Sequence, residues 1–330
     1  MAESIAFKKQ IEFVAVFKAI ACLLILNSHC RDIYPIMFLA VGGGYGNALF
    51  FALSGFCLVN IQQSFFQWYW KRIRRILPVS LLVMIVGVIA VNAQQGGVMS
   101  AYDVLKYSLN QYWFVWAILL YYIIYYFVFR YKPQKYGMTI LMVHFIGYIM
   151  LYIFAVNRQA FSVELEGFSP FKVYFYFGIF VCGGLLRIYS NYIKEFCNRK
   201  MLLILTVIGV LSILLWCVEY VLIMVWNMAL EFQCLIQVSV FIFSVVAVML
   251  GVCLEHRIKI PKGAKGYIIK ALSDCTLEIY LVQVTFKNYI VDLPFPCNWL
   301  VFIIGSIVMG MIFHNMSRIR KLIKPTCDEV

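Results

Sequence analysis

The chain has 330 residues, of which 64% are hydrophobic and 13% are charged, against about 45–50% apolar and 25% charged residues in soluble domains. This composition excludes a soluble enzyme with one buried core, a disordered protein and a disulfide-rich secreted module. The 28 Lys and Arg outnumber the 15 Asp and Glu, and in so apolar a chain the excess indicates membrane orientation ahead of nucleic-acid binding. The 11 cysteines form no Cys-x-x-Cys pair and most lie inside apolar runs, which favours a role as small hydrophobic residues that face lipid or neighbouring helices.

Apolar runs recur at regular spacing along the whole chain, and about ten bilayer crossings of about 20 residues each fit into its length. No linker, repeat or low-complexity segment interrupts them, so we predict one membrane domain over residues 1–330 with an all-α, polytopic helical bundle. The predicted spans are Phe13–Cys30, Val41–Val59, Ile76–Val91, Tyr112–Phe129, Met138–Ala155, Phe171–Ile188, Met201–Val221, Phe232–Leu254, Ile268–Ile290 and Trp299–His314.

The basic residues predict how these spans are oriented, because cytoplasmic loops are enriched in Lys and Arg. With a cytoplasmic N-terminus, 23 of the 28 basic residues fall inside or at the inner face. An odd number of spans would scramble this segregation, so we expect ten spans with both termini in the cytoplasm. We also expect no cleavable signal peptide, since the first apolar run contains a lysine and no cleavage site follows it. The outer side receives five basic residues: Arg31, Lys106, Arg158, Lys172 and Lys287.

Two ionisable residues lie in the first predicted span, where such groups are costly and often functional. Lys18 and His29 are eleven residues apart, which is three helical turns plus roughly 20°, so they share one face about 16 Å apart along the axis. Lys18 is near the cytoplasmic end, where it can instead snorkel to lipid headgroups. His29 lies in the outer third, beside Asn27 and Ser28, and can instead rest in the outer interface.

The second span ends in Ser54 and Gly55 and is followed by a basic cluster, which consists of Lys71, Arg72, Arg74 and Arg75. Guanidinium groups bind phosphate through paired hydrogen bonds, so the cluster suits a phosphorylated ligand at the inner face. Positive-inside topology alone also explains such a cluster. Close packing of two helices through small residues likewise explains the Ser-Gly pair.

The ninth span carries Glu278, Tyr280 and Gln283, a polar set that predicts a helix lining an internal cavity. Hydrogen bonding between helices is the alternative. His144, His256 and His314 have no partners at metal-ligand spacing, so we expect no metal site.

At these residues the sequence resembles acyltransferase family 3, a family of integral membrane O-acyltransferases. The family opens with a basic residue, usually Arg, followed by ten residues and His, and Lys18 and His29 match that spacing with Lys in place of Arg. Its Phe-Phe-x-Leu-Ser-Gly-Phe motif is similar to residues 50–56, and its aromatic, arginine-rich stretch ending in Pro is similar to residues 68–78.

Weaker similarities extend the resemblance to about residue 290. Trp113-Phe114 is similar to the start of the family's fourth span, and residues 175–178 are similar to a Phe-x-x-Gly start of a later span. Residues 276–283 are similar to its penultimate helix, with Gln283 standing where the family commonly has a second His. Because Gln cannot shuttle a proton, any acid–base chemistry is expected to rest on His29.

The resemblance implies transfer of an acyl group, most often acetyl from acetyl-CoA, to a hydroxyl of a cell-envelope or surface glycan. Acyl-CoA is then a co-substrate, bound by Lys71, Arg72, Arg74 and Arg75, and no bound cofactor is expected. His29 acts as general base or forms an acyl-imidazole, and Lys18 supports it or anchors the donor. The candidates for oxyanion or acceptor contacts are Asn27, Ser28, Ser54, Trp113, Glu278, Tyr280 and Gln283.

The expected location is the lipid bilayer of a bacterial inner membrane, with a glycan or glycolipid acceptor as partner and no nucleic acid. Whether the chain forms a homo-oligomer stays open. A carrier that exports a glycan or an acylated small molecule is the alternative function, although paired half-repeats typical of transporters are missing from the sequence.

Overall fold

The computed structural model describes residues 11–164, 167–287 and 289–323, and these residues form helices and loops without a strand. Several helices begin with polar caps: the side chains of Ser100, Ser169 and Asn198 accept hydrogen bonds from the first turns that follow them. The helices are α1 Glu12–Ser28, α2 Gly43–Cys57, α3 Phe65–Gln95, α4 Ala101–Gln111, α5 Trp113–Arg130, α6 Pro133–Ala155, α7 Pro170–Ile188, α8 Ser190–Phe196, α9 Arg199–Met224, α10 Cys234–Cys253, α11 Ala264–Asp274, α12 Thr276–Lys287 and α13 Cys297–Ile323, with short 3-10 turns at Met37–Leu39 and Leu230–Phe232.

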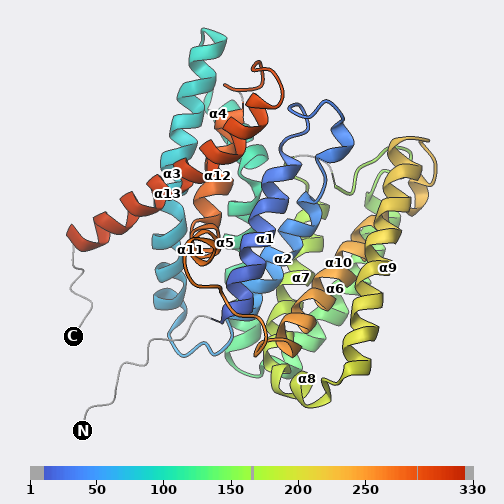
Figure 1. Cartoon of the computed structure of the whole chain (residues 1–330). Coiled ribbons are helices and arrows are strands. Elements are labelled where there is room, and N and C mark those ends of the chain that lie inside the picture. Colours follow the sequence, from blue (N-terminus) through green and yellow to red (C-terminus); the bar gives the residue numbers. More distant parts are fainter. Residues whose placement is uncertain (1–10, 165–166, 288, 324–330) are drawn as a thin grey trace.

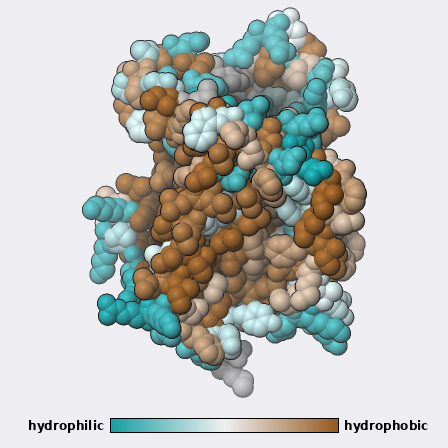
Figure 2. Space-filling view, turned by 90° about the vertical axis from the view of Figure 1, so that its right-hand side faces the viewer, coloured by the Kyte–Doolittle hydropathy of each residue, from teal (hydrophilic) through white to brown (hydrophobic). Residues whose placement is uncertain are grey.

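The molecule has the surface of a membrane protein. Figure 2 shows a broad hydrophobic belt around the middle of one face, with hydrophilic side chains gathered above and below it. In the described part of the chain, seven helices are long and apolar enough to cross a bilayer. Each of the ten predicted ranges overlaps a helix or, for the ninth, a pair of helices, with residue 288 of the ninth range outside the described residues; α4 and α8 have no predicted counterpart. The count of ten spans and the cytoplasmic termini stay predictions, since α1 and α2 have 17 and 15 residues and fall short of a full crossing.

The helices that run between the upper and lower parts of Figure 1 define two ends of the bundle. We call one the basic end, because the first turns of α3 bring Lys71, Arg72, Arg74 and Arg75 there. The opposite end, where α1 finishes and α4 lies, is called the His29 end.

Helix α2 occupies the interior and packs against α1, α7 and α10. Its contact with α7 is close because glycines face it: a Cβ on Gly55 would overlap the carbonyl oxygen of Phe180, and a Cβ on Gly183 would overlap that of Ala52. Gly55 of the Ser-Gly pair in the second span therefore serves close helix packing, which is one explanation that the sequence offered for this pair.

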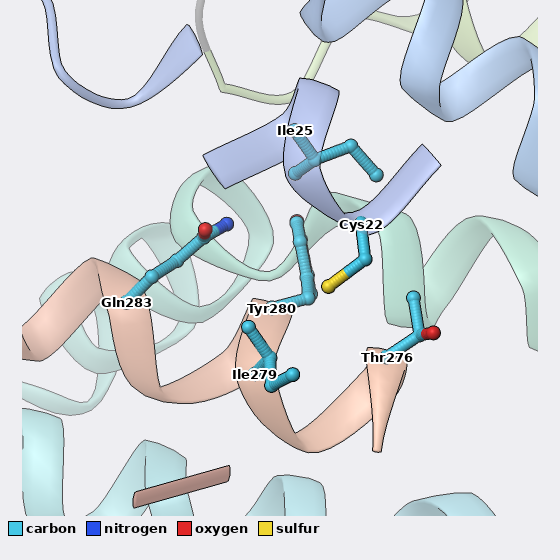
Figure 3. A pocket seen from close by; sticks show the side chains of 6 residues that line it. All are labelled: Cys22, Ile25, Thr276, Ile279, Tyr280 and Gln283. Carbon is cyan, nitrogen blue, oxygen red and sulfur yellow. The ribbon is translucent and has the colours of Figure 1, made fainter. Parts of the chain in front are cut away.

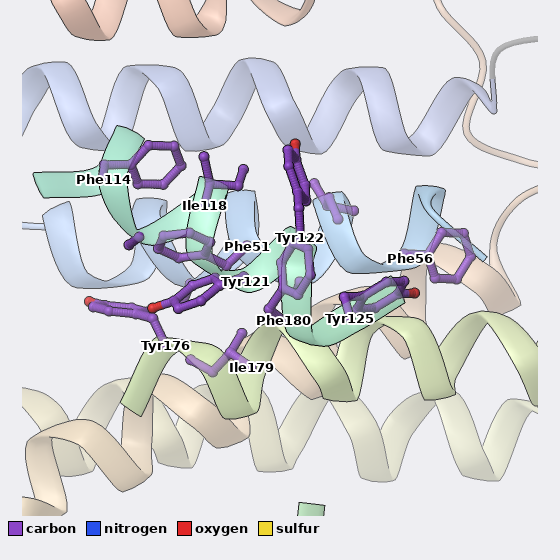
Figure 4. Packing of buried hydrophobic residues seen from close by; sticks show 14 of the residues in the cluster. Phe51, Phe56, Phe114, Ile118, Tyr121, Tyr122, Tyr125, Tyr176, Ile179 and Phe180 are labelled. Atoms are coloured by element: carbon purple, nitrogen blue, oxygen red, sulfur yellow. The ribbon is translucent and has the colours of Figure 1, made fainter. Parts of the chain in front are cut away.

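Aromatic rings fill the space between α2, α5 and α7 (Figure 4). The ring of Phe51 lies at centroid distances of 4.4 Å from Phe114, 5.2 Å from Tyr121 and 5.4 Å from Tyr176. Offset and tilted rings at these distances attract one another beyond the effect of area burial. The first turns of α5 and α7, which carry functional candidates, are held in place by this packing.

The predicted ninth span is not one continuous helix. It is α11 followed by α12, with Cys275 between them, and α11 is seen almost end-on in Figure 1 while α12 runs upward. At this break the hydroxyl of Thr276 donates to the carbonyl oxygens of Leu272 at 2.7 Å and Ser273 at 3.0 Å. The hydroxyl thus satisfies backbone acceptors that a continuous helix would have paired with amides.

Candidate functional site

His29 is the residue at which α1 ends. Its backbone amide donates to the carbonyl of Leu26 at 3.2 Å, and its side chain is half-buried where the chain turns into residues 30–42. The imidazole makes no hydrogen bond within the part of the chain that the structure describes. It is therefore available to a substrate that approaches the His29 end.

Asn27 anchors the loop that follows His29. Its side-chain amide donates to the carbonyls of Leu39 at 2.8 Å and Val41 at 2.9 Å, and its oxygen accepts from the Tyr34 hydroxyl at 2.7 Å. Ser28 donates to the Ile25 carbonyl at 2.7 Å. These two sequence candidates for substrate contacts have their hydrogen-bonding groups engaged by the fold, so their visible role is to place His29.

Two lysines from other helices lie close enough to His29 to act on it electrostatically. The ammonium groups of Lys172, in the first turn of α7, and Lys287, at the end of α12, both act on His29 electrostatically. Lys287 also forms an ion pair with Asp32 of the loop after α1. Positive charge near an imidazole suits a general base, which starts its reaction from the neutral form.

Lys172 is almost fully buried, with 4% of its side chain exposed. Its Nζ lies 4.4 Å from the centroid of the Trp113 ring and donates to the carbonyl of Gly167 at 2.5 Å. The cation is thus stabilised by an aromatic face and a carbonyl dipole. Trp113, a sequence candidate, opens α5 and therefore joins the site through Lys172.

A carboxylate completes this group of side chains. Glu164 lies in the loop between α6 and α7, where its carboxylate accepts from the Tyr176 hydroxyl at 3.3 Å and from the Gln237 amide at 3.3 Å. Burial raises the pKa of the Glu164 carboxyl, while the charge of Lys172 and these hydrogen bonds act in the opposite direction. We call His29, Lys172, Trp113, Glu164 and Tyr176 the His29 cluster.

Sequence reasoning missed Glu164, Tyr176 and the two lysines as site residues. Lys172 and Lys287 were recognised as outer-side charges but were given no role there. The usable signal was that Lys172 stands two residues into an apolar helix, where an ionisable side chain is costly. Tyr176 lies inside the Phe175–Gly178 motif itself.

Lys18 does not contribute the charge beside His29. It is half-buried on α1, without a hydrogen bond or an ion pair within the described ranges, and helical rise separates it from His29 by about 16 Å. The nearby cations are Lys172 and Lys287. Lys18 stays a candidate for the donor side.

The basic cluster is divided between the bundle and the surface. The guanidinium of Arg72 stacks on the Trp68 ring at 3.6 Å from the centroid and donates to the Trp68 carbonyl at 2.6 Å. Lys71, Arg74 and Arg75 are exposed. Three cations at the basic end are therefore accessible to an anionic ligand, and Arg72 is held against the bundle.

The candidates of α12 have different surroundings. Glu278 Oε1 lies 3.0 Å from Nδ1 of His314, which ties α12 to α13. Tyr280 packs on Phe114 at a centroid distance of 5.3 Å and donates to the Gln111 carbonyl at 3.4 Å. Gln283 is fully buried. Ser54 of α2 is half-buried beside the close contact with α7.

A helical bundle with an apolar belt, a histidine under the influence of two lysines at one end and exposed cations at the other is an integral membrane protein with a polar site among its helices. Residues 11–314, nearly the whole chain, match the family model described as an acyltransferase domain of acyltransferase family 3. The chain belongs to this family and is a membrane acyltransferase. Comparisons with curated proteins and with solved structures gave no significant match.

Proposed function

We propose that the protein transfers an acyl group, acetyl in the first place, from cytoplasmic acyl-CoA to a hydroxyl of a cell-envelope or surface glycan. The proposed location is a bacterial inner membrane. The observation that carries this proposal is the pairing of a half-buried histidine with an unengaged imidazole at one end of the bundle with accessible cations at the other.

The donor is assigned to the basic end. Coenzyme A carries phosphates, and arginine forms charge-assisted, bidentate hydrogen bonds with phosphate. Lys71, Arg74 and Arg75 are exposed on the first turns of α3, while the guanidinium of Arg72 is stacked on Trp68 against the bundle. The thioester would then advance along α1 toward His29.

The acceptor hydroxyl is assigned to the His29 end. The imidazole of His29 takes the hydroxyl proton while the hydroxyl oxygen attacks the thioester carbonyl carbon. The carbon–sulfur bond then breaks, and the CoA thiolate leaves and recovers the proton from the imidazolium. Lys172 and Lys287 support this step because they favour the neutral imidazole from which it starts.

The experiment is release of CoA from acetyl-CoA by the purified protein in detergent, with and without cell-envelope glycan extract. Acceptor-dependent release together with acetylated glycan supports direct transfer. A burst of CoA without acceptor, with acetyl retained on the protein, indicates instead an acyl-imidazole on His29. No CoA release, combined with glycan movement across vesicles, favours the carrier alternative.

A further inference from the structure

A narrow gap separates α1 from α12 (Figure 3). It is too narrow to hold a water molecule. Its lining is apolar apart from the polar atoms of a few side chains. The lining residues are Cys22, Ile25, Thr276, Ile279, Tyr280 and Gln283.

Gln283 is the unusual member of this lining. Its side chain is fully buried, and neither its Nε2 nor its Oε1 has a hydrogen-bond partner in the structure. A primary amide offers two donors and an acceptor, and leaving them unmet away from water is costly. Figure 3 shows the amide projecting from α12 toward α1. The side chain is thus directed at a place where a ligand can satisfy it.

The gap lies one helical turn from His29. On α1, Ile25 precedes His29 by four residues, and on α12, Gln283 precedes Lys287 by four residues. Residues four apart lie on the same face of a helix, about one turn from each other. The gap that Ile25 and Gln283 both line therefore lies about one turn from His29 and Lys287, on the side of the basic end.

We propose that this gap is the acyl subsite, where the amide N–H of Gln283 donates to the carbonyl oxygen of a short-chain thioester. The inference rests on the proposed function and deepens it by naming the chemical class of the acyl group. When the acceptor oxygen adds to the carbonyl carbon and His29 takes its proton, the negative charge that develops on the carbonyl oxygen is held by Gln283. Collapse of this intermediate restores the carbonyl and breaks the carbon–sulfur bond.

The lining also explains a preference for short chains. Ile25 and Ile279 are 5% and 1% exposed, and each presents a branched side chain to a gap that already excludes water. An acetyl group needs only a small separation of α1 from α12, whereas each added methylene has to displace packed side chains. The subsite therefore discriminates between acyl groups by their chain length.

The first test is Gln283→Leu, which keeps the size of the side chain and removes its unmet polar atoms. We expect a Tm equal to or above that of the wild type, because a buried amide without partners has been replaced by an apolar group. We expect kcat for acetyl transfer to fall about 100-fold, since loss of one oxyanion donor typically costs that much. A lower Tm with an unchanged kcat would overturn the proposal, because it would make Gln283 a packing residue.

The second test is Ile25→Ala, with Ile20→Ala on the exposed side of α1 as matched control. We expect the ratio of propionyl to acetyl transfer to rise about tenfold in Ile25→Ala, which is the discrimination typical of one methylene in an apolar pocket. The same ratio in both variants would contradict the acyl subsite while leaving the acyltransferase activity in place. No acyl transfer by the wild type from any acyl-CoA would overturn the proposed function and this inference with it.

Discussion

The ammonium group of Lys172 lies over the ring of Trp113, with Nζ 4.4 Å from the ring centroid. The contact joins the first turn of α7 to the first residue of α5. It holds a buried cation near His29, whose imidazole Lys172 affects electrostatically. Trp113, which is similar to a family motif, thus contributes to the site through Lys172, which lies outside the family motifs.

Lys172→Met tests whether this charge sets the protonation of His29. We expect the acidic limb of the pH–rate profile to move to higher pH, while kcat near neutral pH stays close to that of the wild type. The reason is that an imidazole with one cation fewer beside it is protonated more easily. The measurement is the pH dependence of acyl transfer. Lys106→Met, an exposed lysine on α4, is the matched control, and equal profiles for the two variants would contradict the role.

Glu164→Gln tests the buried carboxylate of the same cluster. Burial raises the pKa of the Glu164 carboxyl above its value in the unfolded chain, about 4.3. The native state therefore binds this proton more tightly than the unfolded chain does. The stability gained in this way is complete below a pH of about 4.3 and is lost as the pH rises through the raised pKa. We expect the Tm of the wild type, relative to Glu164→Gln, to decrease from acidic toward neutral pH.

The readout for Glu164 is thermal unfolding of the detergent-solubilised protein at a series of pH values. The exposed Glu231 provides a control, because Glu231→Gln should leave the pH dependence of the wild type in place. A difference between wild type and Glu164→Gln that does not change with pH would contradict the expectation.

Gly55→Ala tests the close approach of α2 and α7. The added Cβ would overlap the Phe180 carbonyl oxygen, and a rigid backbone cannot give way as a side chain can. Overpacking of this kind typically costs about 1–3 kcal/mol, so we expect a clearly lower Tm. Gly97→Ala adds a Cβ where no atom lies within 4 Å and should leave Tm unchanged. Equal Tm values for the two variants would show that the helices are not held so closely.

Arg75→Gln tests the donor side. If the exposed cations at the basic end bind the phosphates of CoA, its KM for acetyl-CoA should rise about tenfold at unchanged kcat, because a charge-assisted hydrogen bond is lost. The increase should shrink at high ionic strength, where exposed charges are screened. Lys132→Gln removes another exposed charge at the same end and should leave KM unchanged. A similar KM for both variants would show that this cluster does not bind acetyl-CoA.

Most helices could be predicted from apolar runs alone, and the agreement is close where polar residues bound the run, as for Phe171–Ile188 against α7. The break at Cys275 could not be predicted in this way, because a hydropathy pattern does not show that the Thr276 hydroxyl caps backbone carbonyls. Nor could the start of α3 at Phe65, since its first turns are amphipathic rather than apolar.

For the site, helical periodicity predicted the shared face of Lys18 and His29, and the resemblance singled out Trp113. Neither could predict that Lys172, 143 residues after His29, would act on both His29 and Glu164, because such contacts depend on tertiary packing. Gln283 was noticed as a departure from a family pattern. Its buried, unpartnered amide became visible only in three dimensions.

The measurement that tests the account most directly is the rate of acceptor-dependent acetyl transfer by wild type, His29→Ala and His256→Ala at matched folded concentration. His256 is an exposed histidine at the basic end and serves as control. If His29 is the general base, its replacement should reduce transfer by about 10²–10⁴-fold, whereas His256→Ala should match the wild type. Transfer by His29→Ala at the wild-type rate would contradict the central claim that this imidazole activates the acceptor hydroxyl.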